Sequence, residues 1–286
     1  MPSIDSRPRV PASRRPKWRA HQRPQRPPLE AGTETAHVLD RDPHAVRPAD
    51  RTERPAGPAS TFSSVLCAAD TSANSRAAHD QAMLLASPGG TLELVPGPEL
   101  IYHGRRALHD ACEGHDLLAL GADAAAFVAV EHAPIPVLIA RWCPLGTDVT
   151  DTILVPVDDS PESTRAVELA GRVAAAHGGT VTILGAPPRD PALQRAIAAS
   201  GRVLLEITGA APRRFGEQLP REHAIPSAAA ALTATLVVLG SGSSEPDRRM
   251  TAQIARSIGC SVLAVPTLEP IPRRRFMRDA RRRSDS

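Results

Sequence analysis

The chain has 286 residues, of which 42% are hydrophobic and only 2% aromatic, so any core must consist mainly of Ala, Val, Leu and Ile. The net charge of +3 conceals a strong segregation. Residues 1–30 carry +6 and residues 269–286 carry +4, whereas residues 61–268, with 15 arginines and 21 carboxylates, carry −6. The part of the chain with the composition of a folded domain is therefore acidic, and the basic total does not by itself indicate nucleic-acid binding.

Composition also excludes several classes of protein. The sequence contains no apolar run of roughly 18 residues, the length expected of a membrane span, and its basic N-terminus lacks the apolar stretch of a secretory signal. The four cysteines are scattered without a CxxC pair, which argues against a disulfide framework. A cytoplasmic protein is expected.

Both ends of the chain are predicted to be disordered. Residues 1–60 hold 11 of the 29 prolines, interleaved with arginines, and show no apolar period. Such a segment cannot bury enough surface to offset the entropy of ordering. Residues 269–286 form a second basic tail without a packing pattern.

The region between the tails alternates short apolar runs with helical patterns, which is typical of a parallel sheet. In residues 61–143 the expected strands begin at Val65, Thr91, Leu117 and Val137. Residues 144–150 form a natural linker.

Residues 151–268 give a fuller series. Strand 153–157 is followed by Ser160 and Pro161, which suit the N-cap and first position of a helix, and Gly178-Gly179 ends that helix. The further expected elements are strand 180–184, helix 190–199, strand 202–207, helix 227–232, strand 236–239, helix 247–258 and strand 261–265. The predicted fold class is α/β, a doubly wound, Rossmann-like parallel sheet of five strands.

The two regions have matching patterns. Val65–Ser72 matches Ile153–Ser160 position for position, and Leu117–Gly121 corresponds to Leu236–Gly240. A tandem repeat is therefore predicted, with domains at 61–143 and 151–268. The first copy is about 30 residues shorter, so it is expected to lack one helix and the third strand.

The order and spacing of these residues resemble the universal stress protein family. That family has a first strand ending in a Val-Pro-Val-Asp-Gly-Ser-like sequence, here Val155–Ser160, and a fourth strand ending in Gly-Ser, here Gly240-Ser241. The resemblance covers 151–268 well and 64–141 more weakly. It implies pairing of the domains through their last strands, within one chain or in a homodimer.

The resemblance also implies a nucleotide site between the first and fourth strands. ATP-binding members place the aspartate near the adenosine and wrap the phosphates in a Gly-x2-Gly-x9-Gly-Ser/Thr loop. Carried over, Asp158 would lie near the nucleoside. Four further residues would lie near the phosphates: Gly240, Ser241, Gly242 and Arg249.

This sequence departs from the loop pattern. Seven residues separate Gly240 from Arg248, against twelve in the family motif, and the loop contains Glu245 and Asp247. Carboxylates repel phosphate, so the expected cofactor is none, or ATP or AMP bound weakly. Asp158 and Asp70 also have a plain interpretation as helix-start residues, and the glycines as turn residues.

Other motifs predict less. The side chains of His109, Cys112 and His115 are potential soft-metal ligands at helical spacing. However, Gly114 is expected to end the helix before His115, so no metal site is predicted. Ser160 has no histidine base nearby in the sequence, so no catalytic residue is predicted.

The preferred interpretation is a cytoplasmic stress-response regulator or binding protein, not an enzyme, with an unknown protein partner. Two alternatives stay open. One is an ATP- or AMP-binding, or ATP-hydrolysing, protein that uses the second domain. The other is a scaffold whose arginine-rich tails bind nucleic acid or anionic partners, although the tails lack the interleaved aromatic residues that base stacking would use.

Overall fold

The computed structural model describes residues 61–97, 100, 104–143, 147–185, 190–216 and 220–267. The predicted disordered ends, 1–60 and 269–286, and part of the predicted linker lie outside these residues. The first region contains β1 (Phe62–Ala69), α1 (Ala73–Leu85), β2 (Ala86–Pro96), α3 (Gly104–Ala111), β3 (Leu117–Gly121), α4 (Ala124–His132) and β4 (Val137–Ala140). The second contains β5 (Thr152–Pro156), α5 (Pro161–His177), β6 (Thr180–Gly185), α6 (Pro191–Thr208), β7 (Arg213–Gly216), α7 (Arg221–Ala231), β8 (Leu236–Ser241), α8 (Glu245–Ser257) and β9 (Ser261–Pro266).

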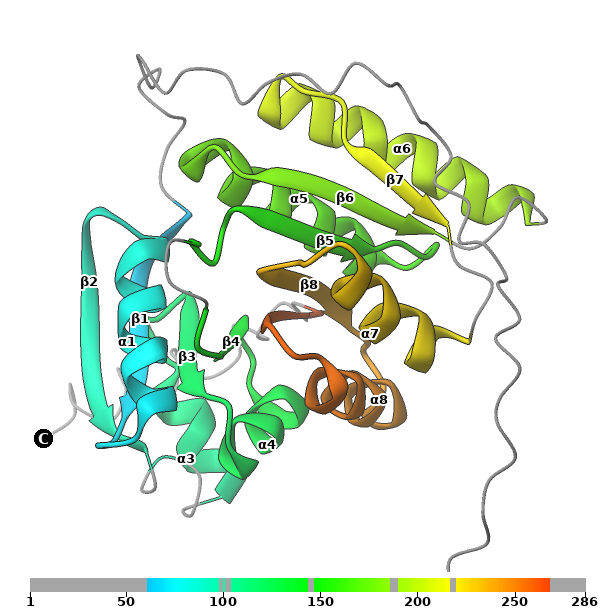
Figure 1. Cartoon of the computed structure of the whole chain (residues 1–286). Coiled ribbons are helices and arrows are strands. Elements are labelled where there is room, and N and C mark those ends of the chain that lie inside the picture. Colours follow the sequence, from blue (N-terminus) through cyan, green and yellow to red (C-terminus); the bar gives the residue numbers. More distant parts are fainter. Residues whose placement is uncertain are drawn as a thin grey trace, which may run out of the picture. The chain divides into compact units, whose positions relative to one another are not determined.

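The strands form one sheet in the order β2-β1-β3-β4-β9-β8-β5-β6-β7 (Figure 1). Neighbouring strands are parallel except at β4 and β9, which pair antiparallel, with Leu138 opposite Leu263. The predicted α/β class is confirmed, and the second region contributes five strands, β5 to β9, to this common sheet. The order β2-β1-β3-β4 repeats the order β6-β5-β8-β9, and the described residues of the first region contain no strand equivalent to β7.

Helices cover both faces of the sheet, which is why its strands read as continuous apolar runs. On one face the core includes residues of α1, α5 and α6 packed on side chains such as Val65 and Ile153. On the other face it includes residues of α3, α4, α7 and α8 packed on Leu118 and Val237.

Contacts between the two regions stabilise the antiparallel β4–β9 pair on both faces of the sheet. Helix α4 packs against α8, and the Arg256 guanidinium lies 4.9 Å from the centre of the Phe127 ring. Gln81 of α1 accepts a hydrogen bond from the buried Ser261 hydroxyl over 2.8 Å. No helix in the described ranges is long and apolar enough to cross a membrane.

The boundaries of α5 follow local sequence rules, as predicted. The Ser160 Oγ accepts a hydrogen bond from the Ser163 N–H at 3.1 Å, Pro161 occupies the first turn, and Gly178 ends the helix with φ of 72°. Only glycine adopts that left-handed conformation without strain.

Replacing Ser160 with alanine is expected to lower the free energy of unfolding by about 1 kcal/mol, because the N-terminal N–H loses its acceptor. Urea denaturation followed by circular dichroism measures this change. Replacing the exposed Ser227, which is within α7 and not at its N-cap, is the matched control and should change the unfolding midpoint less.

Two predicted elements differ from the structure. Residues 202–207, predicted as the third strand, belong to α6, which continues to Thr208 beyond the expected end at 199. The third strand of this region is instead β7. Helix α7 begins at Arg221, six residues before the predicted start, and includes Pro226.

Candidate functional site

A cleft of about 180 Å³ lies at the carboxyl ends of β5 and β8, the two strands between which the strand order reverses. This is the usual ligand position in an open α/β sheet. Asp158 follows β5, Gly240 lies near the end of β8 and Gly242 follows it, and all three line the cleft. The structure therefore brings together three of the five residues predicted for the nucleotide site.

Asp158 is held by neighbouring donors. Its Oδ2 accepts a hydrogen bond from the Arg221 Nη1 at 2.7 Å. Its Oδ1 accepts from the Ser160 N–H at 3.0 Å and from the Ser160 hydroxyl. Each carboxylate oxygen thus already has a protein donor, which supports the plain interpretation of Asp158 as a residue that organises the start of α5.

Gly240 is required by packing. A Cβ at this position would lie 2.8 Å from the Glu162 carbonyl carbon and 2.9 Å from the Ser163 nitrogen. Gly121 in the first region is equally close to the start of α1, because a Cβ at Gly121 would lie 2.7 Å from the Asn74 carbonyl carbon. These glycines let the first turn of a helix lie directly on a strand, so neither needs a phosphate to explain it.

The space next to Gly242 is occupied by a carboxylate. A side chain at Gly242 would collide with the Asp247 side chain. Asp247 accepts a hydrogen bond from the Ser244 hydroxyl, and its N–H donates to the Ser244 Oγ, so it is fixed in the first turn of α8. The loop therefore presents a negative charge beside the glycine that was expected to face phosphate.

Two predicted residues do not line the cleft. Ser241 is buried within β8. Arg249 forms an ion pair with Glu245, four residues earlier on α8, and the two side chains are 65% and 67% exposed. Arg248 donates from Nε to the Gly242 carbonyl at 3.3 Å and so closes the loop. Neither arginine lines the cleft.

Two charged lining residues, Arg221 and Glu162, were missed. Arg221 comes from α7, 63 residues after Asp158, and no local pattern connects them. Glu162 follows Pro161 at the helix start, and its carboxylate accepts a hydrogen bond from the Thr267 hydroxyl. An acidic residue in the first turn of a helix is favoured by the helix dipole. The position of Glu162 directly after Pro161 could therefore have identified it from the sequence.

The charges lining the cleft favour neither ATP nor another polyphosphate. Among the described residues the lining contains three carboxylates, Asp158, Glu162 and Asp247, and one cation, Arg221, which is already paired. Phosphate sites in proteins combine free backbone N–H groups with unopposed positive charge. This lining has the opposite balance.

The equivalent cleft of the first region is also acidic. It measures about 190 Å³ and contains Asp70 and Asp123 without a lysine or arginine among its described lining residues. Hydrogen bonds from Ser72 and Ser75 hold the pKa of Asp70 below its ordinary value. Asp123 caps α4 by accepting from the Ala126 N–H at 2.9 Å.

Two residues of the histidine and cysteine motif, Cys112 and His115, have structural contacts in the first region. The His115 Nδ1 is 2.9 Å from the Ser64 Oγ, and its Nε2 is 3.4 Å from a Glu93 carboxylate oxygen. Cys112 is buried in the core, and burial raises the pKa of its thiol to about 12. No group of three or more His, Cys, Asp or Glu side chains in the described part of the chain is arranged to hold a metal ion.

Comparison with known proteins agrees with this architecture. Residues 150–266 match the model of the universal stress protein family. A universal stress protein from Archaeoglobus fulgidus is similar in fold, with a TM-score of 0.55 and 17% identity over 72% of this chain and 97% of that one. A universal stress protein of Pseudomonas aeruginosa, described as putative, gives 0.50 and 16% over 72% and 93%.

A universal stress protein solved in complex with cAMP has 23% identity and a TM-score of 0.38, and the match covers 42% of this chain and 99% of that one. No curated protein matches the sequence significantly. The family model and the similar solved structures agree for the second region, and residues 150–266 therefore resemble the universal stress protein family in both sequence and fold.

Proposed function

We propose that the protein is a cytoplasmic, universal-stress-protein-like regulator or binding protein of the stress response in which ATP binding is weakened or lost. The observation that carries this proposal is the cleft at Asp158, where three carboxylates face one paired arginine. A nucleotide would have to displace Arg221 from Asp158 and bring its phosphates next to Asp247. Both steps cost electrostatic free energy.

The shorter first region is proposed to be an abbreviated copy of the same domain that pairs with the second within one chain. Its strand order and its glycine at position 121 repeat those of the second region. The antiparallel contact between β4 and β9 is where the last strands of the two copies meet.

A non-enzymatic role is part of the proposal. No histidine lines the cleft within the described residues, and the Asp158 carboxylate that accepts from the Ser160 hydroxyl is already held by Arg221. A serine nucleophile needs an adjacent base that is free to take its proton, so this arrangement favours binding over catalysis.

Isothermal titration calorimetry with ATP, ADP and AMP tests the proposal directly. The full chain is expected to bind each nucleotide with a Kd above about 100 µM. Replacing Asp247 with asparagine removes one negative charge without changing the side-chain shape, so ATP binding should strengthen about five-fold. Asp159→Asn is the matched control, because this exposed carboxylate neighbours the cleft but does not line it.

Micromolar ATP binding by the unmodified protein, abolished by Asp158→Ala, would overturn the proposal in favour of an ATP- or AMP-binding protein. Hydrolysis of ATP above the level of a loop variant would favour an enzyme. Binding to DNA that is lost when residues 1–60 and 269–286 are removed would favour a scaffold that acts through its basic tails.

A further inference from the structure

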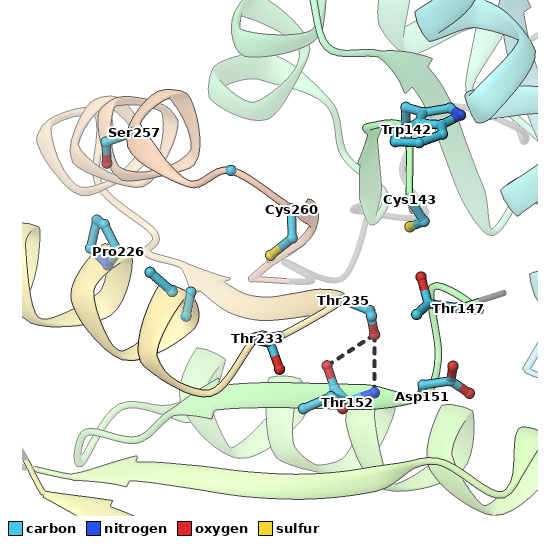
Figure 2. Close-up of a pocket in the computed structure, with 14 residues that line it drawn as sticks. Trp142, Cys143, Thr147, Asp151, Thr152, Pro226, Thr233, Thr235, Ser257 and Cys260 are labelled. Carbon is cyan, nitrogen blue, oxygen red and sulfur yellow. Dashed lines mark hydrogen bonds between the residues drawn. The ribbon is translucent and has the colours of Figure 1, made fainter. Parts of the chain in front are cut away.

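A second cavity, of about 520 Å³, lies at the opposite end of the second region's strands (Figure 2). Its lining includes Thr152 at the start of β5, Thr235 just before β8 and Cys260 just before β9. Trp142 and Cys143, which follow β4, complete it from the first region. Because β5, β8 and β9 are parallel, their amino ends lie away from the Asp158 cleft, and the two sites have no lining residue in common.

The walls are mostly apolar or uncharged. Helix α7 and its end contribute Pro226, Ala229, Ala230 and Ala234. Burial raises the pKa of the Cys260 thiol to about 11, so this thiol is neutral at pH 7 and acts as a small apolar group. Burial, together with the charges of Asp148 and Asp151, also raises the pKa of Cys143.

The hydroxyl groups of Thr233 and Thr235 hydrogen-bond to the backbone around the cavity. The Thr235 Oγ1 donates to the Val149 carbonyl at 2.9 Å. It also accepts from the Thr152 N–H at 3.0 Å, as Figure 2 shows. The Thr233 hydroxyl donates to the Leu232 carbonyl at 2.7 Å. These contacts hold the backbone of the cavity wall, so the hydroxyls do not create a strongly polar lining.

Asp151 is the one charged side chain among the described lining residues. Its Oδ2 accepts from the Asp148 N–H at 2.8 Å, which fixes the carboxylate in the turn before β5. A single fixed anion in an otherwise uncharged cavity attracts a cation and repels an anion. The size is that of a small-molecule site, which typically has apolar walls and a few polar groups that set orientation.

From these contacts we propose that the cavity binds a small, mostly apolar amine. The hydrocarbon part contacts Ala230 and the Cys260 thiol, and the ammonium group lies at Asp151. Trp142 is 65% exposed to solvent and provides further apolar surface beside the bound molecule. This inference does not depend on the state of the Asp158 cleft.

Three probes with one ring system test the charge preference: 1-naphthylmethylamine, 1-naphthylmethanol and 1-naphthoate. Each is titrated into the full chain and followed by chemical-shift changes of the backbone amides. The amine should bind about five-fold more tightly than the alcohol, and the carboxylate more weakly than both, with the largest shifts near Thr233 and Cys260. Asp151→Asn should reduce the affinity for the amine to that for the alcohol.

A matched pair of variants tests the location. Ala230 lines the cavity and Ala231, the next residue of α7, does not, and both are exposed. Ala230→Trp fills the cavity and should weaken amine binding more than ten-fold, whereas Ala231→Trp should leave it unchanged. Equal effects of the two tryptophans, carboxylate binding as tight as amine binding, or an unchanged amine affinity in Asp151→Asn would each overturn the proposal.

Discussion

Replacing Gly240 with alanine is expected to lower the free energy of unfolding by about 2–3 kcal/mol. The added methyl group would meet the Glu162 carbonyl carbon at 2.8 Å and the Ser163 nitrogen at 2.9 Å. Both are backbone atoms at the start of α5, so the helix itself would have to move away from β8. Chemical denaturation followed by circular dichroism measures the loss.

Gly259→Ala is the control for this substitution, because a Cβ there has no atom within 4 Å and the backbone does not adopt a positive φ. Gly121→Ala should reproduce the loss in the first region, since its Cβ would lie 2.7 Å from the Asn74 carbonyl carbon. If Gly240→Ala were as stable as Gly259→Ala, close packing on α5 would not be the reason for the glycine, and a role in ligand binding would regain support.

Replacing Arg141 with alanine is expected to cost about 2–3 kcal/mol, because buried carbonyl groups lose charged donors. The Arg141 Nη1 donates to the Cys260 carbonyl and its Nη2 to the Ala255 carbonyl, each at 2.9 Å. These bonds connect the end of β4 to the end of α8 and the start of β9. The variant should therefore loosen the contact between the two regions as well as lower the unfolding midpoint.

Arg172→Ala is the comparison for the loss of an arginine from the surface. Its guanidinium is 3.8 Å from the Glu168 carboxylate, and both side chains are about half exposed. Such a pair contributes little, so the change should stay below about 0.5 kcal/mol. Similar losses in the two variants would show that Arg141 does not secure the joint between the regions.

The third strand shows where periodicity failed. Residues 202–207 read as an apolar run, but in α6 Leu204 is fully buried while the adjacent Leu205 is 48% exposed, and Ile197 and Leu204 are seven residues apart on one buried face. The strand that does form, β7, has one buried side chain, Phe215, because it lies at the edge of the sheet. An edge strand lacks the continuous apolar run that identifies a central one.

The candidate site was only partly predictable for a related reason. The resemblance to the universal stress protein family pointed to Asp158 and Gly240, and the carboxylates of the loop were visible in the sequence. Arg221 was not, because its contact with Asp158 joins residues 63 positions apart. Arg249 was expected at the cleft, but it lies four residues after Glu245 on the exposed side of α8. It therefore forms an ion pair with Glu245 instead.

The sequence by itself determined the α/β class, the central strands and the start and end of α5, because apolar runs, the Ser160 cap and the glycine at 178 act over a few residues. Only the tertiary structure decided that residues 202–207 are helical, that Arg221 pairs with Asp158, and that Asp247 occupies the space beside Gly242. It alone placed Cys143 and Cys260, which are more than 100 residues apart in the sequence, around one cavity. Such contacts depend on how helices and strands pack across the sheet, and local residue patterns carry no record of them.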